Sequence, residues 1–207
     1  MRTRLTDLLG IEAPILQAPM AGVSTPALAA NVSNAGGLGA IALGALSAEK
    51  AAEAMGATRA ATNRPFAVNV FAHEEPAEDA AQDWLARLAP WFAEFDATPP
   101  DGLRRIYRSI HADAEMRAAI LAVRPPVVSA HFGLLGPDFT AALKAAGTRI
   151  LASATTVEEA KACVAAGCDA VIAQGFEAGG HRGIFGAEDR MIGTFALVPQ
   201  IADAIDR

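Results

Sequence analysis

The sequence has only two cysteines, no block of basic residues and no long apolar run. Cys163 and Cys168 are five residues apart, which fits neither a disulfide framework nor a four-ligand zinc site. A formal net charge of -6 without a Lys/Arg cluster argues against a nucleic-acid or anionic-membrane partner. Neither a signal-peptide core nor a run of membrane-spanning length is present, so we expect a cytoplasmic protein with reduced thiols.

Charged residues make up 19% of the chain and apolar residues 52%, a balance typical of a protein with a substantial buried core. Short apolar runs alternate with helical patterns, which predicts parallel strands joined by helical crossovers. The six predicted strands comprise residues 15–18, 39–43, 66–71, 127–130, 149–152 and 170–173. Capping residues or prolines mark the predicted helices, which comprise residues 25–33, 47–60, 76–95, 113–123, 156–166 and 194–205, with a further helix from Pro137.

A succession of equal strand and helix units curls in one direction, because crossovers between parallel strands are right-handed. We therefore predict an α/β fold of the (β/α)8 TIM-barrel type. A Rossmann sheet would instead place G-x-G-x-x-G after the first strand, which here ends in A-P-M-A-G. A complete barrel has eight units and needs roughly 250 residues. The sequence offers about six units, so we expect a fragment of a longer barrel. Residues 1–207 are interpreted as a single domain that lacks its C-terminal units, with a helical insertion at about 74–112.

Polar or special residues stand at or just beyond the carboxyl ends of the predicted strands, where the site-forming loops of a barrel lie. These residues are Met20, Asn69, His131, Ser153 and Gln174. The last of them opens a loop that reads Q-G-F-E-A-G-G-H-R-G. Its adjacent glycines let backbone N–H groups approach a flat or anionic ligand, while the amide and imidazole offer directional hydrogen bonds. We expect the functional site here.

Five motifs occur in order at these strand ends: Q-A-P-M-A-G at 17–22, A-G-G-L-G at 35–39, V-N-V-F at 68–71, S-A-H-F-G at 129–133 and A-Q-G-F-E-A-G-G-H-R-G at 173–183. Together they resemble the nitronate monooxygenases, formerly called 2-nitropropane dioxygenases, over nearly the whole chain. The resemblance implies a TIM barrel that binds FMN without a covalent bond. It also implies a flavoprotein that oxidises alkyl nitronates, such as propionate 3-nitronate, with O2 to carbonyl compounds and nitrite.

The resemblance also assigns roles to individual residues. It implies catalysis by His131 and His181, and substrate binding by His181 and Tyr107. An imidazole, with an ordinary pKa near about 6.5, can take a proton from the carbon beside a nitro group or hold the anionic nitronate as imidazolium. No metal is expected, because the histidines lie in separate loops without a carboxylate cluster beside them. The implied FMN contacts are Ala18, Pro19, Met20, Asn69, Ser153, Gln174, Gly179 and Gly180.

Two other functions stay open. One is an FMN- and NAD(P)H-dependent enoyl-acyl-carrier-protein reductase, whose barrel and Gly-Gly-His loop are similar. The other is a non-catalytic half-barrel that works only as an assembly piece. Barrels usually hold phosphate at the loops after strands seven and eight, and only six strands are predicted here. We therefore expect residues 1–207 alone to bind FMN poorly and to be inactive. The expected partners are a small nitronate and O2, with no nucleic acid and no membrane, and open strand edges would allow a homo-oligomer.

Overall fold

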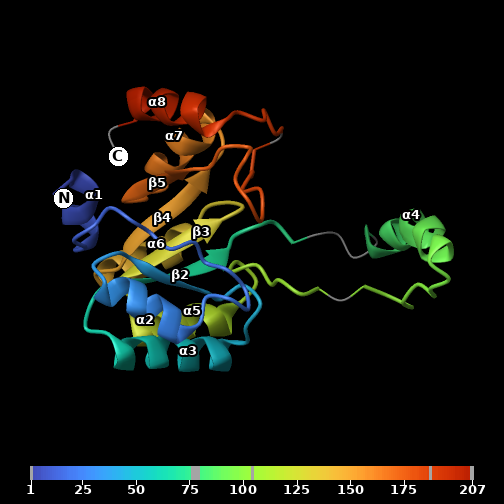
Figure 1. Ribbon diagram of the computed structural model, residues 1–207, viewed down its shortest axis with the longest axis horizontal. Helices are drawn as coiled ribbons and strands as arrows, with labels where there is room; N and C mark the ends of the chain where they lie inside the picture. Colours follow the sequence, from blue (N-terminus) through green and yellow to red (C-terminus); the bar gives the residue numbers. More distant parts are fainter. Residues whose placement is uncertain (1, 76–79, 104, 187, 206–207) are drawn as a thin grey trace.

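A computed structural model describes residues 2–75, 80–103, 105–186 and 188–205 (Figure 1). Its strands form one parallel sheet in the order of the sequence. Each crossover therefore moves in the same direction, which curls the sheet toward a barrel, whereas a doubly wound sheet reverses its order. The predicted α/β fold of barrel type is confirmed, as a partial barrel. The strands are β1 (Gly39–Ala42), β2 (Phe66–Phe71), β3 (Val127–His131), β4 (Arg149–Ala154) and β5 (Ala170–Ala173).

The prediction of a regular first strand at residues 15–18 is wrong, although the segment lies where that strand would lie. It joins the edge of the sheet through one isolated parallel bridge, between Leu16 and Leu38. The backbone N–H of Gln17 donates to the carbonyl oxygen of Leu38 at 2.9 Å. The side-chain amide of Gln17 then bonds both backbone groups of Ala40. The Gln17 side chain thus takes the backbone hydrogen bonds that the next residue of a strand would make with Ala40. The backbone pairing with β1 therefore ends after one bridge.

Most helices begin where the sequence places a capping side chain. Thr25, Ser47, Asp113 and Thr156 each accept a hydrogen bond from the backbone N–H three residues later, as predicted. Sequence inspection missed α1 (Arg4–Leu9), because six residues are too few to show a helical period. The other helices of the body are α2 (Pro26–Asn34), α3 (Ala48–Ala61), α5 (Ala114–Val123), α6 (Pro137–Ala145), α7 (Val157–Ala165) and α8 (Thr194–Ala204).

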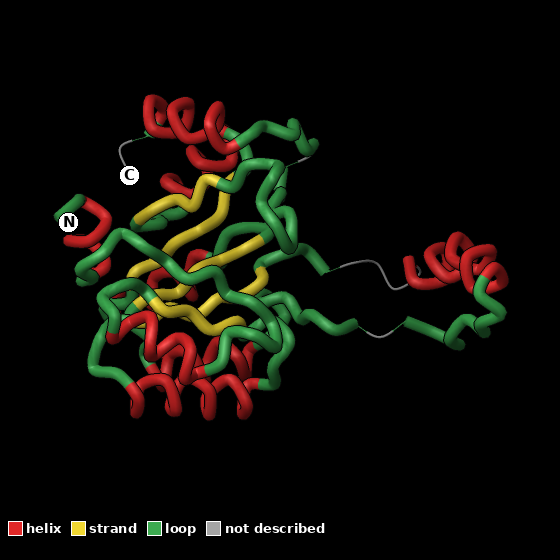
Figure 2. Tube along the Cα trace, in the orientation of Figure 1, coloured by secondary structure: helices red, strands yellow, loops and turns green. Residues whose placement is uncertain are grey.

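Side-chain alternation along the strands separates two buried clusters. On the outer face, Val68 and Val128 pack in the main core with residues of α2, α3, α5, α6, α7 and α8. Figure 2 shows these helices around the outside of the curved sheet. On the inner face, Val127 and Leu151 pack with Leu9 of α1. The inner face is therefore filled at the amino end of the strands, which leaves its carboxyl end for polar residues.

An arm that carries α4 (Ala80–Glu94) projects from the body between β2 and α5 (Figure 1). The predicted helical stretch 76–95 includes residues 76–79, which lie outside the described residues, and its described part is mainly helical as predicted. Trp84 and Trp91 are exposed on this helix. No helix in the described part of the chain is long and apolar enough to cross a membrane.

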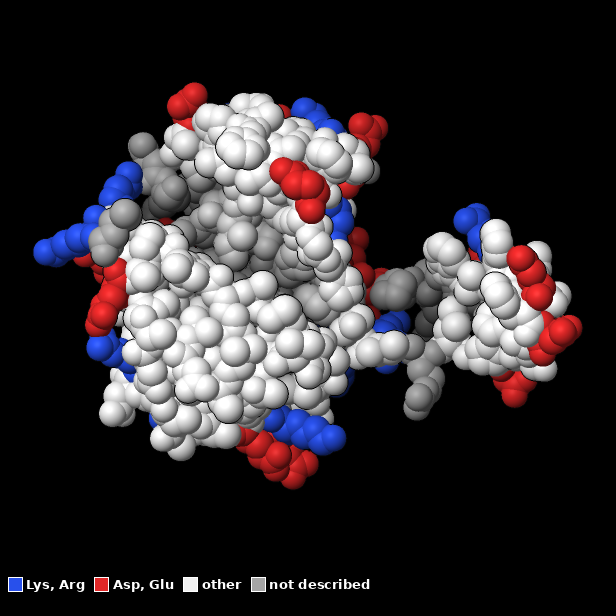
Figure 3. Space-filling model, viewed as in Figure 1, with Lys and Arg blue, Asp and Glu red and all other residues white. Residues whose placement is uncertain are grey.

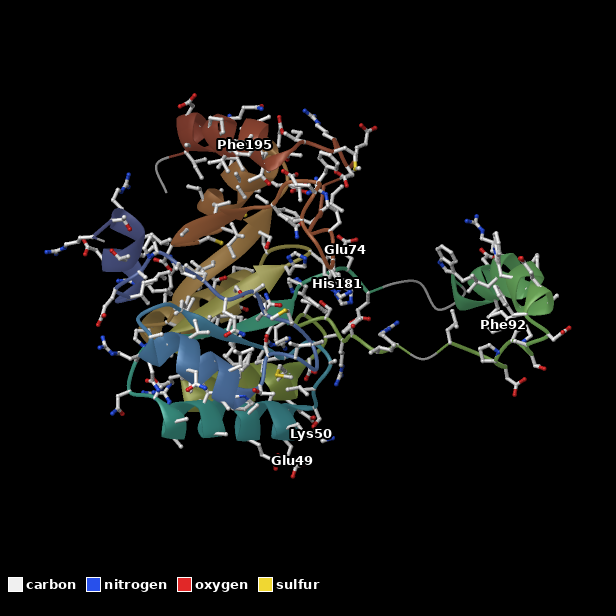
Figure 4. The ribbon with its side chains drawn as sticks, in the orientation of Figure 1. Glu49, Lys50, Glu74, Phe92, His181 and Phe195 are labelled. Atoms are coloured by element: carbon white, nitrogen blue, oxygen red, sulfur yellow. The ribbon has the colours of Figure 1, made fainter. Side chains whose placement is uncertain are left out.

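The described strands do not close into a barrel, because β5 ends the sheet on one side and only the single Leu16–Leu38 bridge extends it beyond β1 on the other. Apolar side chains are exposed beside both edges. Ile15 is 64% exposed beside β1, Ile172 is 37% exposed on β5, and Phe195 on α8 is 98% exposed (Figure 4). Figure 3 shows the face of the body in this view as largely uncharged, with acidic and basic side chains at its rim. A closed barrel has no such edges, so the described strands are an open portion of one.

Candidate active site

Polar side chains from three neighbouring strands stand at the carboxyl end of the inner face. Asn69 on β2 is in register with Ser129 on β3, and its amide nitrogen donates to the Ser129 hydroxyl oxygen at 2.9 Å. Two residues further along β3, Nδ1 of His131 lies 2.9 Å from the hydroxyl oxygen of Ser153 on β4. Strand alternation puts these residues on the same face as the inner core residues below them. The structure therefore brings three predicted site residues, Asn69, His131 and Ser153, onto one surface.

His131 has hydrogen-bond partners at both ring nitrogens. Its Nε2 lies 3.1 Å from the carbonyl oxygen of His181, which can only accept, so Nε2 carries a proton. In the neutral ring, Nδ1 then accepts from the Ser153 hydroxyl. Burial lowers the pKa of His131 below its ordinary 6.5, although the bond to His181 acts in the opposite direction. The ring is therefore neutral at neutral pH, and Nδ1 is the atom that could take a proton.

The loop after β5 folds around the amide of Gln174. Its nitrogen donates to the carbonyl oxygen of His181 at 2.9 Å, and its oxygen accepts from the N–H of Gly183 at 2.6 Å. The Arg182 guanidinium donates to the Gln174 carbonyl oxygen at 2.7 Å and pairs with Asp189 at 2.8 Å. The Gln174 amide, which the resemblance implies as an FMN contact, is thus hydrogen-bonded within its own loop.

The carbonyl oxygen of His181 joins two elements that are far apart in sequence. Both His131 and Gln174 donate to it. Gly183 packs closely against the His131 ring. A Cβ atom at position 183 would lie 2.6 Å from Cε1 of His131. The ends of β3 and β5 therefore lie together, joined through this oxygen.

The other predicted cofactor contacts lie at the surface. Gly179 and Gly180 are exposed, and a Cβ atom at either would meet nothing within 4 Å. Ala18, Pro19 and Met20 are also exposed, the last at 40%. In the part of the chain that the structure describes, no hydrogen bond joins either group to His131. Both groups are open to an approaching ligand.

A cavity of about 800 Å³ lies between the end of β2, the root of the arm and the loops after β3 and β5. Phe71 forms the centre of its aromatic wall, with ring centroids 5.1 Å from Tyr107, 5.4 Å from His181 and 4.9 Å from Phe132. Figure 4 shows His181 and Glu74, which both line the cavity, where the arm leaves the body. Tyr107 and His181, the two predicted substrate-binding residues, therefore share this cavity.

His131 does not line the cavity itself and reaches it through the backbone of His181. His73 and His111 also line the cavity, although no sequence pattern assigns either of them a role. The same holds for Phe71 and Phe132. Their only signal was position, since each belongs to one of the five motifs and adjoins a strand end.

Charged groups gather at the root of the arm. Arg105 lines the cavity and pairs with Glu75, and the carboxylate of Glu75 also accepts from the N–H of Ser109 at 3.0 Å. The cavity wall therefore carries the Arg105 guanidinium, which is fixed by its ion pair with Glu75, beside the aromatic rings. In the described ranges of the chain, no group of three or more His, Cys, Asp or Glu side chains is arranged to hold a metal ion.

Comparison with known proteins identifies the family. A family model for nitronate monooxygenase matches residues 2–206. Nitronate monooxygenase of Paraburkholderia phytofirmans is 54% identical over 202 residues, which is 96% of this chain and 55% of the relative. Nitronate monooxygenase of Pseudomonas aeruginosa is 52% identical over 98% of this chain and 59% of the relative. The chain spans a little more than half the length of these curated relatives.

Solved structures show the same fold. Nitroalkane oxidase from Streptomyces ansochromogenes has a TM-score of 0.83 at 43% identity, over 99% of this chain and 58% of that one. FabK from Thermotoga maritima has a TM-score of 0.71 at 30% identity, over 100% of this chain and 52% of that one. The family model covers nearly every residue of the chain. The chain therefore belongs to the nitronate monooxygenase family.

Proposed function

We propose that these residues form the FMN-binding part and the substrate cavity of a nitronate monooxygenase. The proposed reaction oxidises an alkyl nitronate, such as propionate 3-nitronate, with O2 to a carbonyl compound and nitrite. Residues 1–207 would belong to one barrel domain, and the insertion at about 74–112 would supply Tyr107 to the cavity wall. Family membership supports the chemistry.

The observation that carries this proposal is the pairing of His181 and Tyr107 on one aromatic cavity, with ring centroids 5.4 Å apart. A volume of about 800 Å³ falls within the roughly 300–1,000 Å³ of small-molecule sites. An imidazole and a phenol can both donate hydrogen bonds to the oxygens of an anionic nitronate. The rings around Phe71 would hold its alkyl part away from water.

Residues at the barrel mouth fit a flavin in part. Asn69 and Ser153 offer an amide and a hydroxyl on the inner face, and the open Gly179–Gly180 surface lets backbone N–H groups come close. Gln174 fits less well, because its amide is bonded to its own loop. Bound FMN would supply the electron acceptor that side chains lack. We expect the 207-residue chain to bind FMN weakly, because barrels usually hold the phosphate at loops after strands seven and eight.

The protein's own contribution would be placement and charge. His131 donates from Nε2 to the His181 carbonyl oxygen and so orients the residue that faces the cavity. If Nδ1 of His131 takes a proton, the N–H that forms would donate to the Ser153 hydroxyl oxygen, whose own hydrogen can turn away. His131 would thus act on the substrate through His181.

The visible absorption spectrum of the purified chain, before and after addition of excess FMN, provides the first test. Excess FMN is used because we expect the chain alone to bind it weakly. In the complex that forms, with O2 excluded, an alkyl nitronate should bleach the flavin and NADPH should not. Tyr107→Phe should weaken binding of the nitronate to the chain, whereas Glu49→Gln on α3 should leave it unchanged. Bleaching by NADPH alone would favour the enoyl-acyl-carrier-protein reductase. A chain that binds no FMN but forms a stable complex with a second polypeptide would favour the non-catalytic half-barrel.

A further inference from the structure

The loop at residues 181–186 forms one wall of the cavity and is held at two points. At its start, Gln174 and His131 donate to the carbonyl oxygen of His181. At its end, the backbone N–H groups of Phe185 and Gly186 donate to a carboxylate on α7, that of Glu159, at 2.8 and 2.7 Å. The second anchor lies outside the residues that the sequence assigned to the site.

Glu159 uses both oxygens of its carboxylate, and each accepts two hydrogen bonds. One oxygen accepts from the N–H and the hydroxyl of Thr155 at 2.6 and 2.7 Å. The other accepts from the loop. Glu159 is the third residue of α7, where a glutamate often bonds the backbone N–H of the N-cap residue. Here it bonds Thr155, the residue just before the N-cap Thr156, in a similar way. Helix capping accounts for the first oxygen only, and the second is committed to the loop.

The surroundings favour the ionised form of this side chain. Glu159 is only 4% exposed, and burial acts to raise its pKa. The hydrogen bonds from Phe185, Thr155 and Gly186 outweigh burial, and the pKa is lowered overall. Hydrogen bonds to Asp189 are the main cause of the raised pKa of the Arg182 guanidinium, and the charge of Glu159 contributes to it. Burying an ionised carboxylate costs free energy, and only a complete set of hydrogen bonds offsets that cost. All four hydrogen bonds to Glu159 are therefore needed.

Gly186 fits this arrangement sterically. A Cβ atom at Gly186 would lie 3.3 Å from the Glu159 oxygen that accepts from the loop, tighter than most such contacts. The loop backbone can therefore approach the carboxylate closely because position 186 has no side chain. Phe185, the residue before it, lines the cavity.

We propose that Glu159 is a positioning residue of the active site, whose carboxylate holds residues 185–186 so that Phe185 and His181 stay on the cavity wall. It contacts no reacting atom. The proposal rests on the proposed function only in treating this cavity as the active site. Loss of the outer anchor would let the loop open from its Gly186 end and weaken the His181 contacts to His131 and Gln174.

The test compares Glu159→Gln with Glu158→Gln on the full 207-residue chain. Glu159→Gln keeps the size of the side chain but replaces one acceptor oxygen with an NH2 donor. The NH2 group would then face the donors of either Thr155 or the loop, and those hydrogen bonds would be lost. Glu158 is a matched control, because it is the preceding residue of the same helix, with a side chain 68% exposed and 3.9 Å from Arg190.

The first readout is cleavage by trypsin at Arg182, which lies within the loop. Losing a hydrogen bond to a charged group typically shifts the open population by about tenfold or more. We expect Glu159→Gln to be cut at least about tenfold faster than the wild type, and Glu158→Gln to be cut at the wild-type rate. The second readout is the NMR titration of His131, whose pKa should rise toward its ordinary value as the loop no longer buries the ring.

A purely structural role for Glu159 would lower stability without changing either loop cleavage or the His131 titration, and that result would overturn the proposal. If Glu159→Gln does not fold, hydrogen exchange in the wild type decides. The N–H groups of Phe185 and Gly186 should then exchange as slowly as that of Thr155, and unprotected exchange would refute the anchor. No readout uses flavin or nitronate, so failure of the proposed function would not affect the result.

Discussion

Substitution of Gly183 by alanine tests whether the loop after β5 is seated on His131 as the structure shows. The added Cβ atom would lie 2.6 Å from Cε1 and 3.0 Å from Nδ1 of His131, and 3.2 Å from the Gln174 amide oxygen. Gly183 is not among the glycines with positive φ, so backbone strain does not contribute. The cost should therefore come from crowding alone.

Two responses to this crowding are open, and the cheaper one sets the loss of stability. The loop can stay in place while His131 shifts, which typically costs about 1–3 kcal/mol for an overpacked site. Alternatively the loop can lift, which breaks the bonds of Gly183, Gln174 and His131 in this region at roughly 2–4 kcal/mol in total. We expect Gly183→Ala to lower the free energy of unfolding by about 1–3 kcal/mol.

Urea unfolding of the protein without added flavin measures this loss. Gly179→Ala is the matched control, because it lies in the same loop with open space around its Cβ position. It should change the free energy of unfolding by less than about 0.5 kcal/mol. NMR signals of the His131 ring should shift in Gly183→Ala and not in Gly179→Ala. Equal stabilities of the two variants, with unchanged His131 signals, would refute the seating of the loop.

Three further predictions follow from the same structure. Burial lowers the pKa of His131, so its neutral ring contributes stability that is complete above about pH 6.5 and is lost as the pH falls through the folded-state value. The free energy of unfolding should therefore fall less for His131→Asn than for the wild type between about pH 7 and 5, and equal slopes in pH-dependent urea titrations would contradict this. Hydrogen bonds from Arg182 lower the pKa of Asp189 to about 2, so Arg182→Gln should return it toward 3.8 in a carboxyl NMR titration; an unchanged midpoint would count against the pair. A Cβ atom at Gly39 would lie 1.8 Å from the carbonyl oxygen of Ala29. Gly39→Ala should therefore lower the free energy of unfolding by about 3 kcal/mol or more in thermal or urea unfolding. A wild-type midpoint would disprove the close contact of α2 and β1.

Local features of the sequence determined the fold class and most element positions. Alternating apolar runs predicted all five strands of the sheet, and capping residues predicted where α2, α3, α5 and α7 begin. These features can be read because each depends on neighbours within one turn or one strand. The failures have local causes as well. Residues 15–18 look like a strand, yet the Gln17 side chain takes over the pairing, and α1 is too short to show a period.

The site itself was only partly readable from the sequence. Strand ends and motifs indicated His131, Ser153 and Gln174, because the carboxyl ends of parallel strands meet at one edge. The direction of the Gln174 amide and the anchoring role of Glu159 were not predictable. Both depend on where the loop after β5 returns, which brings together residues 50 positions apart for His131 and His181 and 26 apart for Glu159 and Phe185. Composition and spacing along the chain do not encode such contacts, because strand register and loop closure decide them only when the whole sheet has formed.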